Sequence, residues 1–203
     1  MIKIQGKIPR QVMVAVSGGV DSMAALDFLR RNHAVEVYYF NHGTEYSERA
    51  EDLVRRYIMK HNLPFQIRGI AKGTKPKGKS WEEWWRDERY KWMDLFSQHH
   101  LPVITCHHLD DCVETWVWSS MHGTGKIIPY RRNGVIRPFR TTRKRQLELW
   151  AAMHNVPYLE DDSNADVCYT RNYIRHEMMP HVLRVNPGIH KTIAKKVRDD
   201  YVS

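Results

Sequence analysis

The stretch VMVAVSGGVDS, residues 12–22, indicates what kind of sheet this chain builds. Its first half is a run of β-branched and small apolar residues, which predicts a strand buried on both faces. Its second half, SGGVDS, places two glycines before the helical apolar pattern of residues 21–31. A buried strand, a tight glycine turn and a helix, in that order, are typical of a parallel α/β sheet.

The same alternation of strand and helix continues along the chain. The expected strands are residues 12–16, 35–40, 65–70 and 103–106, and the expected helices are residues 21–31, 47–61, 80–99 and 110–121. Ser47 is the expected N-cap of the second helix, and the sequence SWEE at residues 80–83 fits a capping box for the third. We therefore expect a Rossmann-like α/β fold with a parallel sheet, helices on both faces, and ligands at the carboxyl ends of the strands.

The character of the sequence changes after Gly125. Strand signals fade there, and basic helical patterns follow at residues 143–154, at residues 173–184 and from residue 188 onward. We expect a sheet domain over residues 1–140 and a basic helical extension of the same unit over residues 141–203. A separate segment, AKGTKPKGK at residues 71–79, is loop-like and is open to three interpretations: a solvated linker, a lid over a nucleotide, or a patch for RNA phosphates.

The composition limits the classes of partner. The chain has 203 residues, a net charge of +9 and 42% hydrophobic residues, with a sequence pI near 9.5. This favours a globular protein with a polyanionic partner such as nucleic acid. Three scattered cysteines argue against a disulfide framework, and neither a signal peptide nor a membrane-spanning run is apparent. We expect a cytoplasmic protein with no membrane association.

The SGGVDS turn carries the main chemical signal. Gly18 and Gly19 allow a tight turn and close approach of the backbone to a ligand, and the free N–H groups of the following helix form an anion site. Ser17 and Ser22 add hydroxyl donors, whereas Asp21 beside a phosphate suggests an intervening Mg²⁺ ion. No lysine follows the glycines, so the segment is not a Walker A loop.

The hexapeptide instead resembles the PP-loop of the N-type ATP pyrophosphatases, the adenine nucleotide α hydrolase-like proteins. That resemblance implies that residues 1–140 form a PP-loop ATP-pyrophosphatase domain. It also implies that Ser17, Gly18, Gly19, Asp21 and Ser22 bind ATP, with the loop on its β- and γ-phosphates and pyrophosphate as the product.

Further segments resemble one branch of this family, the tRNA(Ile)-lysidine synthetases. They match its NHG, ARxxRY, HHxDDxxET, RPL, EDxSNxD and YxRNxIR elements in family order. The matching segments here are residues 41–43, 85–90, 107–115, 137–139, 160–166 and 169–175. Trp85 stands where alanine is usual and Cys112 where glutamine is usual. Together these ordered matches are far more specific than any one of them.

The resemblance implies ATP-dependent adenylation of the wobble cytidine of a CAU-anticodon isoleucine tRNA, followed by attack of free lysine. Arg86 would offset negative charge at the reaction centre. Asn41 and His42 would contact adenosine, and Asp21 would hold Mg²⁺. Arg171, Asn172 and Arg175, together with the acidic residues Asp110, Asp111 and Glu114, would serve the tRNA or lysine.

The residues alone leave alternatives for Asp111 and Glu114, which lie three apart at a helix start. Such a pair can bind an ammonium group, hold Mg²⁺ or accept a proton. Joint metal binding by His107 and His108 is disfavoured, because adjacent strand residues point to opposite faces. Of the tryptophans at residues 81, 84 and 85, we expect at least two to pack in the core, while any of them could stack on an extruded base.

Two other functions compete with this interpretation. One is a PP-loop ligase that acts on another RNA base or on a small molecule. The positive charge and the YxRNxIR match argue against the small-molecule form. The other is a non-catalytic RNA-binding relative, against which the intact SGGVDS and DDxxE segments argue. Family members usually carry C-terminal tRNA-reading domains, so we expect a minimal form, a fragment or a relative with another target. No stable protein partner is required by the expected reaction.

Overall fold

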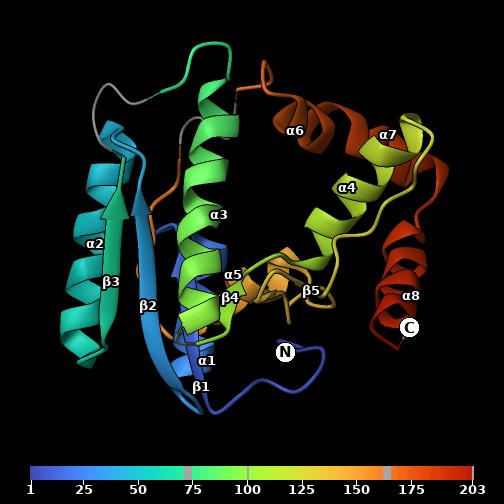
Figure 1. Ribbon diagram of the computed structural model, residues 1–203. Coiled ribbons are helices and arrows are strands. Elements are labelled where there is room, and N and C mark those ends of the chain that lie inside the picture. The colour runs from blue at the N-terminus through green and yellow to red at the C-terminus, as the bar shows by residue number, and fades with distance from the viewer. Residues whose placement is uncertain (71–74, 100, 162–165, 203) are drawn as a thin grey trace.

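The computed structural model describes residues 1–70, 75–99, 101–161 and 166–202. It has a six-stranded sheet in the order β3-β2-β1-β4-β6-β5. The strands are β1 (Gln11–Val16), β2 (Ala34–Asn41), β3 (Phe65–Gly69), β4 (Val103–Thr105), β5 (Arg131–Arg132) and β6 (Val135–Ile136). All neighbours pair in parallel except β5, which pairs antiparallel to β6. The parallel α/β sheet predicted from the sequence is confirmed (Figure 1).

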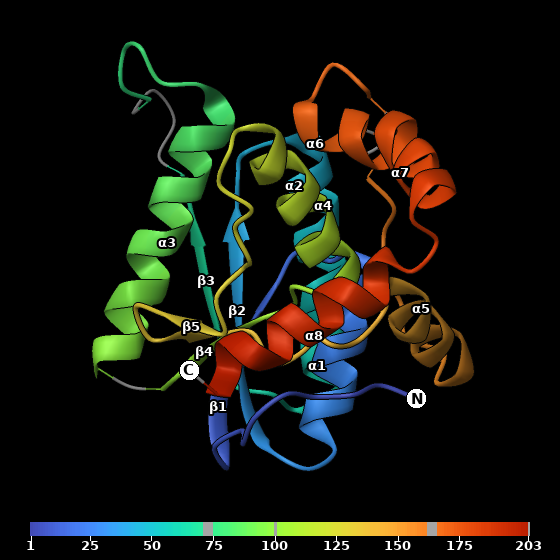
Figure 2. The same ribbon diagram turned by 90° about the vertical axis from the view of Figure 1, so that its right-hand side faces the viewer.

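Helices cover both faces of this sheet (Figures 1 and 2). In chain order they are α1 (Val20–Arg30), α2 (Glu45–His61), α3 (Trp81–His99), α4 (Leu109–Met121) and α5 (Lys144–Met153). The C-terminal helices are α6 (Thr170–Tyr173), a π-helical turn (Ile174–Met178), α7 (Met179–Val185) and α8 (Ile189–Val202). Among the described residues, no helix is both long and apolar enough to cross a membrane.

The alternation of side chains along β1 explains the two layers. Val12, Val14 and Val16 face the larger core, which includes residues of α1, α2 and α5. Met13 points to the other face, where Met93 and Phe96 of α3 pack. Because successive strand residues point to opposite faces, a continuous apolar run is what a strand covered on both sides requires. A third cluster joins α4 to α8 through Leu109, Ile193 and other apolar side chains.

Two local expectations are wrong. Thr44, not Ser47, is the N-cap of α2, and Ser47 sits three residues later as the reciprocal half of the capping box. Strand structure also continues beyond Gly125, because β5 and β6 form a hairpin around Asn133 and Gly134, both with positive φ. Each of these strands has two residues, too few to produce the period of alternation that identifies a strand.

The helix boundaries otherwise agree closely with the sequence. Ser80 caps α3, since its hydroxyl accepts the Glu83 N–H at 3.1 Å. The predicted helix over residues 173–184 is one part of the helical segment from Thr170 to Val185, which includes the π-helical turn. Leu147 and Ala151 of α5 lie in the main core. The division of the chain at residue 140 stays a prediction.

The Asp27 carboxylate connects the helices α1, α2 and α5. Its carboxylate, 2% exposed, accepts hydrogen bonds from Tyr57 Oη of α2 at 2.7 Å and from Trp150 Nε1 of α5 at 2.9 Å, and it pairs with Arg30 and Arg31. Burial pushes the pKa of Asp27 upward, but the hydrogen bonds from Tyr57, Trp150 and the arginines outweigh it and lower the pKa to about 2. The ionised carboxylate therefore stabilises the folded state.

Asp27→Asn is expected to lower the free energy of unfolding at pH 7 by about 2 kcal/mol, from the size of the pKa shift. Because the folded pKa lies below the ordinary value of 3.8, this stability is present above about pH 4 and is lost as the pH falls toward 2. Urea denaturation at pH 7 and pH 3 measures both effects. Asp52→Asn, an exposed change on α2, is the control, and equal losses in the two variants would contradict the assignment.

Candidate functional site

A cavity of about 700 Å³ opens at the carboxyl ends of β1, β2 and β4. Its walls come from the turn after β1, the end of β2, one face of α3, the start of α4 and the first turns of the C-terminal helices. The candidate residues among its lining are Ser17, Asp21, Ser22, His42, Asp111, Arg171, Asn172 and Arg175. Parallel sheets place ligand sites at this edge, and most of the residues predicted from sequence meet there.

Hydrogen bonds within the SGGVDS turn fix its shape, and no side chain caps the start of α1. The Ser17 N–H donates to Ser22 Oγ at 3.1 Å, and Ser22 Oγ donates to the Gly19 carbonyl at 3.0 Å. Gly19 is the N-cap of α1 and provides no side-chain cap. The first N–H groups of α1 thus keep no side-chain acceptor at the cap position, which favours an anionic group there.

Gly18 lets this turn lie against α2. Its φ is +83°, and a Cβ atom built on it would lie 2.8 Å from Cβ of Ala50. The Gly18 carbonyl also accepts the Leu159 N–H at 2.9 Å, which fixes the chain after α5 against the turn. Gly19 differs, since its φ is −76° and an added Cβ would meet only Ser17 Oγ, at 3.6 Å.

Gly18→Ala is therefore expected to lower the free energy of unfolding by roughly 1–3 kcal/mol, through left-handed strain and the clash with α2. Gly19→Ala is the matched control and should change stability by less than about 1 kcal/mol, because its backbone suits any residue. Equilibrium denaturation in urea measures both variants. A larger loss at Gly19 than at Gly18 would show that the close contact with Ala50 does not limit this turn.

Asp21 has one carboxylate oxygen buried without a partner. Its Oδ1 makes no hydrogen bond to any described residue, while Oδ2 lies 3.6 Å from Nε2 of His108. The His108 ring is 2% exposed, and its Nδ1 accepts the Asp111 N–H at 3.2 Å, so the proton of the neutral ring is on Nε2, facing Asp21. Asp21 is thus held by its surroundings with an oxygen free for a ligand.

The predicted pair Asn41 and His42 divides into two roles. The Asn41 side chain forms hydrogen bonds within the fold. Its Nδ2 donates to Glu51 at 2.7 Å, and its Oδ1 accepts from the Gly43 N–H and Ser47 Oγ, each at 2.8 Å. His42 lines the cavity. Burial, followed by the positive charge of Arg89, lowers the pKa of His42 to about 4, so the ring is neutral at pH 7.

A group of buried polar atoms without partners surrounds His42. Besides His42 Nδ1, it comprises Tyr38 Oη, Trp85 Nε1 and Arg89 Nε, none of which has a hydrogen-bond partner among the described residues. All four side chains line the same cavity. Buried polar groups normally have hydrogen-bond partners, so four unpaired polar atoms on residues that line one cavity indicate a polar ligand.

Arg86, the arginine predicted to be catalytic, is exposed and does not line the cavity as the structure has it. Arg89, one turn further along α3, lines the cavity instead, and burial lowers its pKa. Arg89 belongs to the ARxxRY match at residues 85–90, in which only Arg86 was predicted to act. The spacing of Trp85 and Arg89, four apart on α3, is the signal that would have grouped them.

The acidic pair of α4 is joined to the C-terminal helices. Glu114 accepts hydrogen bonds from Arg175 Nε at 2.8 Å and Nη2 at 3.0 Å, while Asp111 Oδ1 accepts from Arg171 Nη2 at 2.6 Å. Burial pushes the pKa of Asp111 upward, but His108, followed by Arg171, more than offsets this and lowers the pKa to about 2. Two carboxylates and two guanidinium groups thus form a charge-balanced network at one wall of the cavity.

Asp110 points away from this network. It accepts hydrogen bonds from Arg143 and from the Lys144 N–H of α5, and it contacts His190 of α8. The contacts with His190, the Lys144 N–H and Arg143 outweigh burial and hold the pKa of Asp110 well below its usual range. Its assignment to a substrate stays a prediction, whereas its contacts in the structure join α4 to α5 and α8.

Several other expected features have mixed outcomes. His107 lines the cavity, and its Nδ1 lies 3.0 Å from Thr105 Oγ1. Of the tryptophans at residues 81, 84 and 85, only Trp84 is buried, at 5% exposure, so the expectation that at least two pack in the core is wrong. Trp81 is 55% exposed and Trp85 lines the cavity. Asn172 lines the cavity and donates to the Asp166 carbonyl at 2.9 Å. Residues 71–74 of the lysine-rich segment and 162–165 of the EDxSNxD segment lie outside the described residues.

The chain is similar to known proteins over most of its length. The family model described as a PP-loop domain matches residues 2–182. A tRNA(Ile)-lysidine synthase of Thermotoga maritima is 32% identical over 200 residues, covering 92% of this chain and 48% of that protein. The Lactiplantibacillus plantarum protein of the same name is 36% identical over 203 residues, covering 92% and 45%. The chain therefore spans about half the length of these relatives.

Solved structures support the fold. The U34-tRNA thiolase NcsA from Methanococcus maripaludis superposes with a TM-score of 0.73 at 15% identity, covering 96% of this chain and 72% of that one. An NH3-dependent NAD synthetase from Campylobacter jejuni gives 0.52 at 14% identity, with 97% and 87% covered. At these identities the likeness concerns the fold alone.

Proposed function

The chain belongs to the PP-loop family, and from this premise we propose that it is the catalytic part of a tRNA(Ile)-lysidine synthetase. One observation carries the proposal. A single cavity brings the SGGVDS turn together with Asp111 of the DDxxE segment and with Arg171 and Arg175 of the YxRNxIR segment. The similarity to proteins of that name extends over 92% of the chain.

In the proposed first step, the C2 oxygen of the wobble cytidine attacks the α-phosphorus of ATP. The bond from that phosphorus to the bridging oxygen breaks, and pyrophosphate leaves. The open start of α1, with Ser17 and Ser22, is placed to hold the β- and γ-phosphates. Arg89 lines the same cavity and offers a buried positive charge near the reacting groups, a role that we extend from Arg86 to this neighbour.

The residues present fit Mg²⁺. Asp21 supplies a buried carboxylate oxygen with no partner among the described residues, next to the proposed phosphate site. No group of three or more His, Cys, Asp or Glu side chains suited to a metal occurs among the described residues. Mg²⁺ commonly binds through one or two carboxylates and the substrate phosphates, so such a group is not needed. When bound, the ion would offset phosphate charge.

In the proposed second step, the ε-amine of free lysine attacks C2 of the adenylated base. The bond from C2 to the oxygen carrying AMP breaks, AMP leaves, and the amine loses a proton. Asp111 lines the cavity, and Glu114 accepts a hydrogen bond from Arg175, which also lines it. The negative charge of both carboxylates would attract the ammonium group of an incoming lysine.

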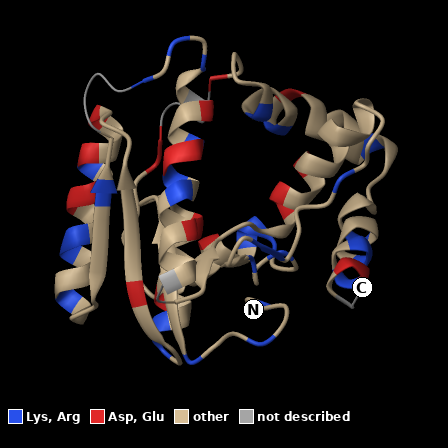
Figure 3. Ribbon diagram, viewed as in Figure 1, with Lys and Arg blue, Asp and Glu red and all other residues tan. Residues whose placement is uncertain are grey.

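We further propose that the chain binds tRNA through its basic residues and acts in the cytoplasm. Figure 3 marks Lys and Arg positions before α3, on α6 and on α8. Contacts of such residues with RNA phosphates are salt-dependent and carry little sequence information. The three cysteines are free thiols, as a reducing compartment favours.

ATP labelled at the α- and γ-phosphates tests the proposed reaction class. With an unmodified CAU-anticodon isoleucine tRNA and lysine, the α label is expected in AMP and the γ label in pyrophosphate. This follows from attack at the α-phosphorus and from the lack of a Walker A lysine. ADP and inorganic phosphate as main products would overturn the proposal. Release of AMP without lysine transfer to tRNA would retain the ATP chemistry and reject the substrate.

A further inference from the structure

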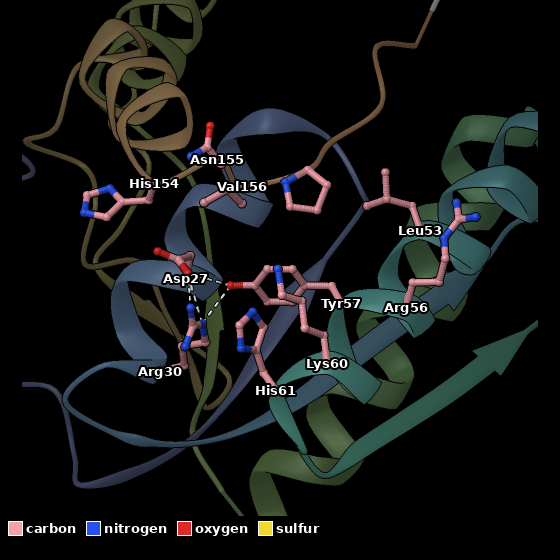
Figure 4. Close-up of a pocket in the computed structure, with 11 residues that line it drawn as sticks. Asp27, Arg30, Leu53, Arg56, Tyr57, Lys60, His61, His154, Asn155 and Val156 are labelled. Carbon is pink, nitrogen blue, oxygen red and sulfur yellow. Dashed lines mark hydrogen bonds and ion pairs between the residues drawn. The ribbon is translucent and has the colours of Figure 1, made fainter.

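A second cavity, of about 360 Å³, lies at the far end of α1 from the SGGVDS turn. It is formed by the last turns of α1 and α2 and by the segment after α5, His154 to Pro157 (Figure 4). The eleven residues of α1 place its two ends about 15 Å apart at 1.5 Å per residue. The cavity is thus separate from the proposed nucleotide site, and the proposed reaction does not use it.

Three cationic side chains, two histidines and one acid line this cavity. They are Arg30, Arg56 and Lys60, then His61 and His154, and Asp27. Asp27 is fully engaged, because its two oxygens receive Tyr57, Trp150, Arg30 and Arg31. It therefore neutralises charge on α1 and has no capacity to balance Arg56 and Lys60.

Arg56 and Lys60 are uncompensated in the structure. Neither has an ion-pair partner within 4 Å among the described residues, in contrast to Arg55, which pairs with Glu51 at 2.8 Å. The two are four apart on α2, where like charges face each other and destabilise a helix by a few tenths of a kcal/mol. Besides burial, the charges of Arg30 and Lys60 lower the pKa of His61. Positive potential therefore accumulates at this cavity.

The cavity walls strengthen the attraction for an anion. Leu53, Val156 and Pro157 form an apolar wall, and the Tyr57 and His61 rings lie 4.5 Å apart between centroids, tilted by 58°. Figure 4 shows Arg30, Tyr57, Lys60 and His61 gathered between α1 and α2, with Arg56 beside Leu53. Charges beside apolar walls are less screened by water, so their attraction for an anion is greater than on an open surface.

From this arrangement we infer a second ligand site, in which Arg30, Arg56 and Lys60 bind a phosphate group. A phosphate monoester carries between one and a half and two negative charges at pH 7, which matches the two uncompensated cations better than the single charge of a carboxylate. The neutral His61 ring can donate one further hydrogen bond. The charge favours a small phosphorylated molecule with a terminal phosphate. An RNA backbone phosphodiester offers similar oxygen acceptors but a single charge, and the experiment distinguishes the two.

Titration of the full chain with inorganic phosphate tests the inference, with sodium chloride at matched ionic strength as the reference. His61 is followed by NMR of ring-labelled histidine and assigned with His61→Asn. A bound anion favours the protonated ring, so phosphate is expected to raise the pKa of His61 in a saturable manner. No saturable change with phosphate or RNA, or an equal change with chloride, would overturn the site.

The double variant Arg56→Gln/Lys60→Gln is expected to weaken phosphate binding at least tenfold, and Lys60→Gln alone gives a second, milder test. The matched control is Lys195→Gln/Lys196→Gln, which removes the same charge from exposed positions on α8 and should leave binding unchanged. At saturating tRNA, adenylation should be retained in Arg56→Gln/Lys60→Gln, since neither residue lines the nucleotide cavity. Equal weakening of phosphate binding in both double variants would show only an effect of net charge.

A second arm uses the isoleucine tRNA in place of phosphate. If tRNA shifts the His61 signals and phosphate competes with it, the site holds an RNA phosphodiester. If phosphate shifts them and tRNA does not, the ligand is a small phosphorylated molecule. Either outcome retains the site, because both require the same cations, and the loss of the response in Arg56→Gln/Lys60→Gln is expected in both.

Discussion

Asp21→Asn is expected to slow pyrophosphate release from ATP by about a hundredfold or more, the size typical for loss of one electrostatic stabiliser at a reaction centre. Asp21 Oδ1 is buried and has no partner among the described residues, whereas the same atom lies beside the open start of α1. An amide there keeps the shape of the side chain but removes the charge that a Mg²⁺–phosphate complex requires.

The stability of the Asp21 variant should change little. Asp21 Oδ1 has no hydrogen-bond partner among the described residues, and Oδ2 faces His108 Nε2 at 3.6 Å, a contact that the oxygen of an asparagine side chain can keep. The measurements are pyrophosphate release over a Mg²⁺ titration, urea denaturation and tRNA affinity, with Asp52→Asn as the control. Wild-type turnover at saturating Mg²⁺ would show that Asp21 does not hold the ion.

The opening βα unit could be predicted because its signals are local. The run at residues 12–16 and the glycines at 18 and 19 fix a buried strand and a turn within eleven residues. The hairpin of β5 and β6 was missed for the opposite reason, since its short strands are stabilised by pairing with β4. The Asn133–Gly134 dipeptide was its only strong local signal.

Many residues of the site could be predicted from the sequence, but the contacts between them could not. Arg86 and Arg89 look equivalent in sequence, and only the packing of α3 on the sheet places Arg89 at the cavity and leaves Arg86 exposed. The hydrogen bonds between Glu114 and Arg175 span 61 positions, so no periodicity indicates them. Motif resemblance identified the two segments as functional, while their contact depends on how α4 meets the C-terminal helices.

This contact makes Glu114→Gln the most informative change for the second proposed step. Glu114 and Asp111 balance Arg171 and Arg175, two charges against two. Removing one carboxylate leaves the network positive, so an incoming lysine ammonium is repelled. A charge-assisted interaction is worth roughly 1.5–3 kcal/mol, and half-maximal rate should therefore require about ten- to a hundredfold more lysine. The apparent affinity for ATP should change much less.

Lysine and ATP dependence must be measured separately, because Arg175 also lines the nucleotide cavity. If Glu114 serves mainly to position Arg175 for ATP, both dependences will weaken together, and the assignment of the acidic pair to lysine is wrong. Asp110→Asn is the matched control, since it removes a carboxylate from the same DDxxE segment but touches Arg143, Lys144 and His190 instead. It should lower stability and leave the lysine dependence unchanged. A lysine defect in Asp110→Asn equal to that in Glu114→Gln would mean that the acidic segment acts through the docking of α4 on its neighbours, and not through a charge presented to the substrate.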